Sequence, residues 1–355
     1  MAKRDYSLVG PDAERAVEVG LASAKWYHSD ITRSEMKKLL KRTDGPAVRD
    51  SIVLFGAMFA FAGIGIAMWP SLWSMPVWLA YGVIYGSAMD SRWHECGHGT
   101  AFRTPLFNDV IYEIASFCMI RNSVTWRWSH FRHHTDTIIV GRDPEIVAMR
   151  PPRLFRIFLN FFGIVDAWKG WSRMLLNASG RLSEEERTFI PEAEQPKVVR
   201  VARIWTGIYA VTIGSAFALS SVLPLMLIGL PRLFGAWHHV MCGVLQHAGL
   251  AENVLDHRLN TRTVYMNPVS RFLYWNMNYH VEHHMYPMVP FWQLPSLHER
   301  IRHDLPAANP SIYHAYRELW PVLKRQLRYE DFFLKRSLPP SAKPYREDFH
   351  GAALG

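Results

Sequence analysis

Histidine occurs in this sequence in short clusters whose spacing suits metal binding. The segments HFRHH and HVEHH repeat the pattern H-x-x-H-H about 150 residues apart, and HECGH and LQH contribute further histidines. Residues three and four apart lie on one face of a helix, so each cluster directs its imidazoles to one side. Neutral imidazole is the commonest side-chain metal ligand. The clustered histidines are His94, His98, His130, His133, His134, His247, His280, His283 and His284.

The number of clustered histidines indicates more than one metal ion. Nine imidazoles exceed the four ligands of a structural zinc site and the three protein ligands of a typical catalytic one. Two ions with four or five imidazoles each would keep open coordination positions. Zinc has no redox chemistry, and no cysteine or methionine is placed here for a blue-copper site, so iron fits the clusters best.

Three further histidines have no role that the sequence alone assigns. His239 precedes His247 by two helical turns and would face the same way. Packing, or support of a metal ligand, is nevertheless the favoured interpretation of His238 and His239. His257 stands alone in the sequence, and a lone histidine is more often a core or surface residue than a ligand.

Two blocks of apolar sequence must position these clusters. The chain has 355 residues, of which 49% are hydrophobic and 20% charged, and it contains 14 Trp. Residues 51–69 carry no charge and would span about 28 Å as a helix, close to the thickness of a hydrocarbon core. Together with the apolar runs 76–91, 204–221 and 224–246, they predict four transmembrane helices in two hairpins. Pro231 could break the last of these helices.

The charge pattern orients the predicted hairpins. The loop within each hairpin carries no Lys or Arg, whereas the sequences flanking the first hairpin carry several. The positive-inside rule therefore places both termini and every histidine cluster in the cytoplasm. The net charge of +9 fits an anionic membrane surface or an acidic protein partner, and the sequence has no nucleic-acid-binding motif.

The fold class expected from these features is an all-α integral membrane protein whose cytosolic helical cap carries the histidine clusters. Residues 1–50 are predicted to form a cytosolic N-terminal helical segment, 51–295 the membrane-bound catalytic domain, and 296–355 a cytosolic C-terminal tail. The apolar but partly charged residues 154–171 are predicted to lie in the membrane interface. A further helix is predicted to begin at Ser183.

The histidine clusters and their neighbours resemble those of a known family. HECGH, HFRHHTDT followed by GRDPE, LQHAGL and NYHVEHHMYP, in this order beside two hydrophobic hairpins, resemble the membrane fatty acid desaturase and hydroxylase superfamily. The resemblance covers about residues 50–295. Within the superfamily, the run from RLNTRTVYMNP to NYHVEHHMYPMVP is most similar to the bacterial rhizopine-catabolism desaturase-like oxygenase branch.

The resemblance implies a non-haem di-iron centre that uses O2 to attack an unactivated C–H bond. It implies that all nine clustered histidines are iron ligands, His247 being the position that varies most in the family. Asp143 and Glu282 are candidates to fix imidazole tautomers, with a solvated surface acid as the alternative for each. Asn278 is a candidate to hold a metal-bound water, or simply a helix cap.

The sequence contains no C-x-x-C pair, no G-x-G-x-x-G loop and no fused haem domain, so electrons must come from outside. The expected donor is a ferredoxin or rubredoxin with its reductase. The basic cytosolic face would dock an acidic donor, or it is ordinary positive-inside charge.

The predicted function is O2-dependent desaturation or hydroxylation of a fatty acyl or lipid-like substrate in the bacterial inner membrane, among membrane lipids. The ligand set also allows oxidative demethylation of a small polar molecule. A membrane metal transporter is the alternative from another class, although transporters usually hold their ligands near the middle of the bilayer. A soluble zinc hydrolase, suggested by the likeness of HECGH to H-E-x-x-H, does not explain the other clusters.

Overall fold

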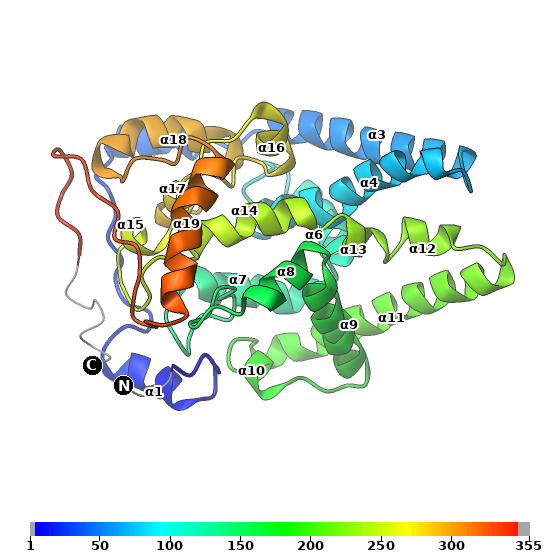
Figure 1. Ribbon diagram of the computed structural model, residues 1–355, viewed down its shortest axis with the longest axis horizontal. Coiled ribbons are helices and arrows are strands. Elements are labelled where there is room, and N and C mark those ends of the chain that lie inside the picture. The colour runs from blue at the N-terminus through cyan, green and yellow to red at the C-terminus, as the bar shows by residue number, and fades with distance from the viewer. Residues whose placement is uncertain (1–3, 347–355) are drawn as a thin grey trace.

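The chain folds into helices joined by loops (Figure 1). The computed structural model describes residues 4–346, and within that range the only strand-like pairings are the isolated bridges Thr263–Tyr279 and Val264–Asn309. The all-α expectation is therefore confirmed. The last residues of the predicted C-terminal tail, 347–355, lie outside the described part of the chain.

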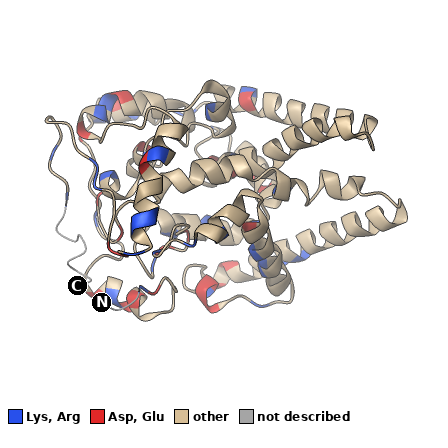
Figure 2. Cartoon of the chain, in the orientation of Figure 1, with Lys and Arg blue, Asp and Glu red and all other residues tan. Residues whose placement is uncertain are grey.

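The first apolar block forms a long hairpin. Helix α3 (Gly45–Ala67) leads out, and the chain returns through α4 (Met75–Val83), the π-turn η2 (Ile84–Ala88) and α5 (Met89–Gly97). The turn between the two arms exposes Leu72 and Trp73 almost completely. Figure 2 shows the outer parts of both arms almost free of charged residues, which is the composition that a lipid environment requires.

The second apolar block has one long arm and one broken arm. Helix α11 (Gln195–Ala218) begins well before the predicted start at residue 204. The predicted fourth span, 224–246, is not one continuous helix but three short ones, α12 (Leu223–Leu227), α13 (Pro231–Phe234) and α14 (Trp237–His247). The physical reason lies between α12 and α13, where Gly229 has a positive φ of 95° and Pro231 has no N–H to continue a helix.

Within residues 4–346, two segments are long and apolar enough to cross a membrane, Gly45–Ala67 and Glu192–Ala218. Each belongs to a different hairpin, and each is followed by a return arm built from shorter helices. Figure 1 shows both hairpins extending from the same end of the molecule. The structure thus contains both predicted hairpins, while the crossing of the membrane by four helices remains a prediction.

The other helices form the cap at the opposite end. The capping box that Ser183 makes with Glu186 confirms the predicted helix start. The cap helices are α1 (Pro11–Glu18), α2 (Arg33–Leu39), α6 (Pro105–Met119), α7 (Ser123–Thr135), α8 (Leu154–Phe161), α9 (Ile164–Ala178), α10 (Glu184–Arg187), α15 (His257–Asn260), α16 (Pro268–Leu273), α17 (His280–Met285), α18 (Leu294–Ile301) and α19 (Ile312–Gln326).

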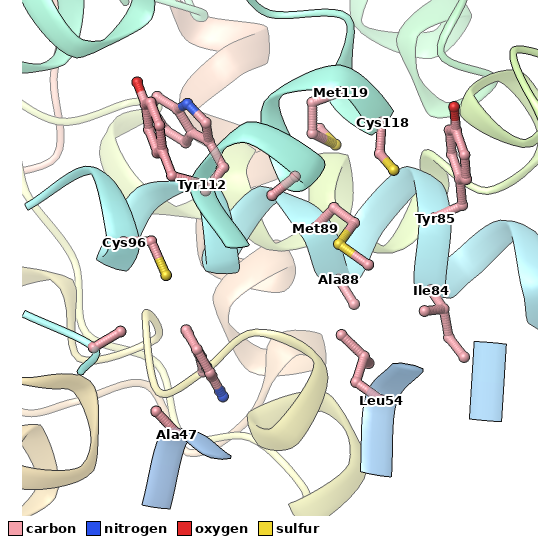
Figure 3. Packing of buried hydrophobic residues seen from close by; sticks show 14 of the residues in the cluster. Ala47, Leu54, Ile84, Tyr85, Ala88, Met89, Cys96, Tyr112, Cys118 and Met119 are labelled. Carbon is pink, nitrogen blue, oxygen red and sulfur yellow. The ribbon is translucent and has the colours of Figure 1, made fainter. Parts of the chain in front are cut away.

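A shared apolar core joins the first hairpin to the cap. Leu54 from α3, Met89 from α5 and Met119 from α6 belong to one buried cluster (Figure 3). Cys96, on the buried side of α5, lies in the same cluster, between the histidines His94 and His98. Burial of this apolar surface fixes α5 against α6, and with it the direction in which the first histidine cluster points.

Candidate metal centre

Four segments of the chain carry the clustered histidines to one place. Helix α5 carries His94 in its last turn and is followed by His98 at its C-cap, α7 holds HFRHH, α14 ends with His247, and α17 is built from HVEHH. The start of α7 is fixed by Asn122, whose side-chain oxygen accepts a hydrogen bond from the backbone N–H of Val124 at 3.1 Å. Because α17 begins and ends within the buried interior, all of its residues are buried.

The nine histidines form two groups, and in each group one ring nitrogen per residue lies within 4.8 Å of all the others. We call these the first and the second histidine group. The first group combines α5, α7 and α17, and the second combines α7, α14 and α17. The first group consists of His94, His98, His130, His134 and His283, and the second of His133, His247, His280 and His284.

Neighbouring Nε2 atoms within a group are as far apart as ligands on one metal ion. In the first group, His98 and His134 place Nε2 at 3.0 and 3.1 Å from Nε2 of His130. In the second group, His247 and His284 place Nε2 at 3.2 and 3.1 Å from Nε2 of His280. Metal–nitrogen bonds of about 2.1 Å at right angles separate two nitrogens by about 3.0 Å.

The outer ring nitrogens of several histidines are held by hydrogen bonds that leave Nε2 free to bind metal. His247 donates from Nδ1 to the carbonyl oxygen of Asn260 at 2.9 Å, and a carbonyl can only accept. His133 donates from Nδ1 to Asp143 at 2.8 Å. The Nδ1 atom of His130 lies 3.1 Å from the carboxylate of Glu145. Such contacts fix the tautomer and the orientation of a metal-binding imidazole.

The electrostatic environment favours neutral imidazoles at most of the clustered positions; His133 is the exception, because burial lowers its pKa but Asp143 and Glu145 together raise it above the usual value. Burial lowers the pKa of His130, His134, His283 and His284, and the neighbouring imidazoles lower it further. Nε2 of His94 is buried and has no hydrogen-bond partner in the described structure. A buried polar atom without a partner is costly, and a cation in the first group would satisfy it. The donor set therefore fits two metal ions that accept nitrogen ligands.

The three predicted supporting residues differ in their contacts. Asp143 contacts His133 directly, as described above. Glu282 instead accepts from Thr263 at 2.6 Å and bonds to His298, so within the described chain its carboxylate has no hydrogen bond to a clustered histidine. Asn278 donates to the carbonyl of Val264 at 2.8 Å, while its own side-chain oxygen is buried without a described partner.

Several partners of the histidines were not predicted, among them Thr137, whose hydroxyl lies 3.3 Å from Nδ1 of His284, and Gln246, whose side-chain nitrogen lies 3.2 Å from Nδ1 of His280. Glu145 ends the GRDPE segment, two residues after Asp143, and the spacing was a usable signal because the same tight turn presents both carboxylates. Asn260 contacts His247 through its backbone carbonyl. A backbone contact between residues in different helices has no signature in the sequence.

The undecided histidines lie outside both groups. Nε2 of His238 lies 3.2 Å from the hydroxyl of Ser270, and Nε2 of His239 is 3.9 Å from Asp166. His257 stacks face to face on Trp26, with ring centroids 4.2 Å apart.

Two adjacent cavities give access to the centre. The inner cavity, of about 150 Å³, is lined by histidines of both groups, including His94, His130 and His247. The outer cavity, of about 770 Å³, lies between α8, α9 and the loop that contains Asp143. Trp126 and Asp166 line both cavities, so the inner one adjoins the outer one.

Comparison with known proteins agrees with this geometry. The fatty acid desaturase family matches residues 67–320, which include all nine histidines, and the chain belongs to this family. The family consists of oxidoreductases.

Individual relatives are distant. The chain is 23% identical over 290 residues to the sn-2 acyl-lipid omega-3 desaturase (ferredoxin), chloroplastic, of Arabidopsis thaliana, an alignment that covers 76% of this chain and 62% of the relative. It is 25% identical over 300 residues to the omega-3 fatty acid desaturase, chloroplastic, of Sesamum indicum, covering 78% and 63%. It is 23% identical over 310 residues to the Delta(12)-oleate desaturase of Trichosanthes kirilowii, covering 77% and 80%. The chain thus spans less than two thirds of the first two relatives.

Proposed function

We propose that this protein is an O2-dependent, non-haem di-iron oxidoreductase that desaturates or hydroxylates an unactivated C–H bond of a fatty acyl or lipid-like substrate. The observation that carries the proposal is the convergence of nine imidazoles into two adjacent groups. Membership of the desaturase family supports it. The further likeness to the rhizopine branch remains a prediction.

Each part of the site has a role in this proposal. The first and second histidine groups would each hold one iron ion, and the pair of ions, when bound, supplies the activation of O2 for attack on a C–H bond. Asp143, Glu145 and the carbonyl of Asn260 orient imidazoles through contacts to Nδ1, which leave Nε2 for the metal. The inner cavity adjoins both groups and would position the reacting carbon.

The electron donor is proposed to be an external ferredoxin or rubredoxin with its reductase. Desaturation consumes two electrons and two protons for each O2, in addition to those taken from the substrate. The name of the Arabidopsis thaliana relative specifies ferredoxin. The same proposal places the protein in the bacterial inner membrane, with four crossings and the histidine groups on the cytoplasmic side.

The test is expression in a bacterial host with and without a ferredoxin and its reductase, followed by analysis of cellular acyl chains and bound metal. We expect new unsaturated or hydroxylated chains only when the donor is present, and about two iron atoms per chain. A protein that carries only zinc after native expression, or that moves metal across vesicle membranes without oxidising any lipid, would contradict the proposal.

A small polar substrate is the second candidate, because ion pairs line the inner cavity. Asp90 pairs with Arg121 at 2.5 Å and Glu252 with Arg150 at 3.5 Å, and all four residues line the cavity. An apolar cavity of about 150 Å³ holds a molecule the size of benzene, and here the lining is partly charged. Oxidation of a carbon beside an ether or amine would then give demethylation. Metabolite profiling of the expressing strain, with and without the donor, separates this outcome from acyl oxidation.

A further inference from the structure

The outer cavity is lined by cations that lack acidic partners. Arg156 on α8 and Lys169 on α9 both line it, together with Arg153 at the start of α8. Among the residues that the structure describes, neither Arg156 nor Lys169 makes an ion pair. By contrast Arg173, also on α9, pairs with Glu186 at 2.9 Å.

The positive charge of Arg156 acts on the ammonium group of Lys169. The pKa of Lys169 lies below its usual value, because the surrounding protein displaces water from the ammonium group and because the guanidinium of Arg156 repels it. Asp166 and Glu185 line the same cavity and partly offset this repulsion, without an ion pair to either cation in the described structure. An oxyanion bound by both cations would remove the remaining cost.

The surroundings of the two cations indicate what kind of molecule carries the anion. Phe155 and Trp168, each adjacent in sequence to one of the cations, expose 73% and 71% of their surface. Large apolar side chains beside basic ones are typical of the boundary between lipid and water. An amphiphile whose charged end stays at this boundary therefore matches the outer cavity better than a neutral or wholly polar molecule.

We propose that the outer cavity binds the oxyanion head group of the substrate, a carboxylate or a phosphate, through Arg156 and Lys169. The chain attached to that head group then extends past Trp126 and Asp166 into the inner cavity, beside both histidine groups. This inference rests on the proposed oxidation and adds the class of substrate to it. Specificity for an anionic amphiphile comes from the outer cavity, whereas the position of oxidation comes from the inner one.

The experiment measures ligand binding rather than turnover. Full-length protein in nonionic dodecyl maltoside micelles is titrated with oleate, oleoyl lysophosphatidate, oleyl alcohol or inorganic phosphate, and binding is followed by thermophoresis. We expect at least one anionic amphiphile to bind about tenfold more tightly than oleyl alcohol, as one or two charge-assisted contacts predict. Preference for oleate identifies a carboxylate, and preference for the lysophosphatidate a phosphate. The preference should weaken with added salt.

Substitution of Arg156 and Lys169 tests whether these two cations bind the anionic head group. Combined Arg156→Gln and Lys169→Gln should raise Kd for the preferred anion to that of the alcohol, whereas Arg156→Lys keeps most of the affinity. Lys38→Gln is the matched control, because Lys38 is an exposed cation on α2 outside the cavity lining. Equal binding of alcohol and anions, an unchanged double variant, or binding of inorganic phosphate without preference for either lipid anion would overturn the proposal. Binding requires no turnover, so failure of the proposed oxidation leaves this test intact.

Discussion

His133 donates a hydrogen bond from Nδ1 to Asp143, at 2.8 Å, and this contact ties a member of the second histidine group to a buried loop. The carboxylate of Asp143 also accepts the backbone N–H groups of Ile138 and Glu145, both at 2.7 Å. Because two backbone N–H groups already donate to this carboxylate, Asp143 acts as an acceptor and His133 donates to it from Nδ1. The Nε2 lone pair of that ring is thereby turned toward the other histidines.

Replacement of Asp143 by asparagine should weaken metal binding without unfolding the protein. An amide is a poorer acceptor than a carboxylate and does not stabilise the imidazole as a ligand, so we expect iron affinity to fall about 10- to 100-fold. Competition with a chelator during dialysis, followed by elemental analysis, measures the change. Asp109→Asn is the control, because its side chain is 64% exposed and lies outside the site. Equal iron retention in the two variants would show that the contact does not support metal binding.

Replacing one histidine in each group tests whether both histidine groups bind metal. His133→Ala removes a nitrogen from the second group and His283→Ala one from the first. Each variant should lose turnover and bind less iron than the roughly two atoms expected of the parent, while it stays in the membrane, because metal binding needs the full set of ligands. His303→Ala, at an exposed position of the cap, should keep both properties. Full activity in either site variant would dismiss that residue as a ligand.

The four-crossing topology predicts which residues face each side of the membrane. Ser71→Cys and Ser221→Cys, in the turns of the two hairpins, should react with an impermeant maleimide on intact cells. Ser296→Cys, an exposed position on α18, should react only after the membrane is opened. The three natural cysteines are free and buried, so their background labelling is expected to be low. Labelling of Ser71→Cys without Ser221→Cys would reduce the topology to one hairpin.

Eight of the nine clustered histidines could be selected from the sequence because their spacing is local, whereas His247 stands alone in its segment and was assigned as a ligand through the family resemblance. In H-x-x-H-H the helix itself places the rings on one side, whatever the rest of the fold does. Which histidine belongs to which group could not be predicted from this local spacing. His133 and His134 are adjacent in α7 yet belong to different groups, because the rotation of α7 against α17 and α14 decides which ion each ring faces.

Two sequence interpretations differ from the structure for separate reasons, although the break at Pro231 was itself considered from the sequence. The predicted span 224–246 followed average hydropathy, whereas the backbone breaks at Gly229 and Pro231 for local steric reasons. Glu282 lies between two clustered histidines in sequence, yet it turns away from them toward His298 and Thr263. Successive residues of a helix point in different directions around its axis. A residue that is adjacent in sequence to a metal-binding histidine therefore need not contact the site.

The last prediction concerns the attachment of the terminal segments to the cap. Asp304 is buried and accepts from Tyr27 and Ser29, both at 2.6 Å, from the backbone of Lys343 at 2.9 Å and from Arg258 at 3.0 Å. Burial alone would raise the pKa of Asp304, but these hydrogen bonds and the charge of Arg258 outweigh it and hold the pKa below its usual value. Asp304→Asn should therefore cost about 2 kcal/mol at pH 7, because it removes a charge-assisted contact from Arg258, which keeps its ion pair with Asp256.

The pH dependence distinguishes this electrostatic role from simple packing. A carboxyl group whose pKa is lower in the folded protein contributes stability above its unfolded pKa, about 3.9, and loses that contribution as the pH falls through the lower folded value. The thermal midpoints of the parent and of Asp304→Asn should thus differ fully above about pH 5 and converge in stronger acid. Asp30→Asn is the matched control, because its side chain is 80% exposed beside the same terminal segment, and its midpoint should follow the parent at every pH. A difference for Asp304→Asn that persists unchanged in acid would assign the loss to packing instead.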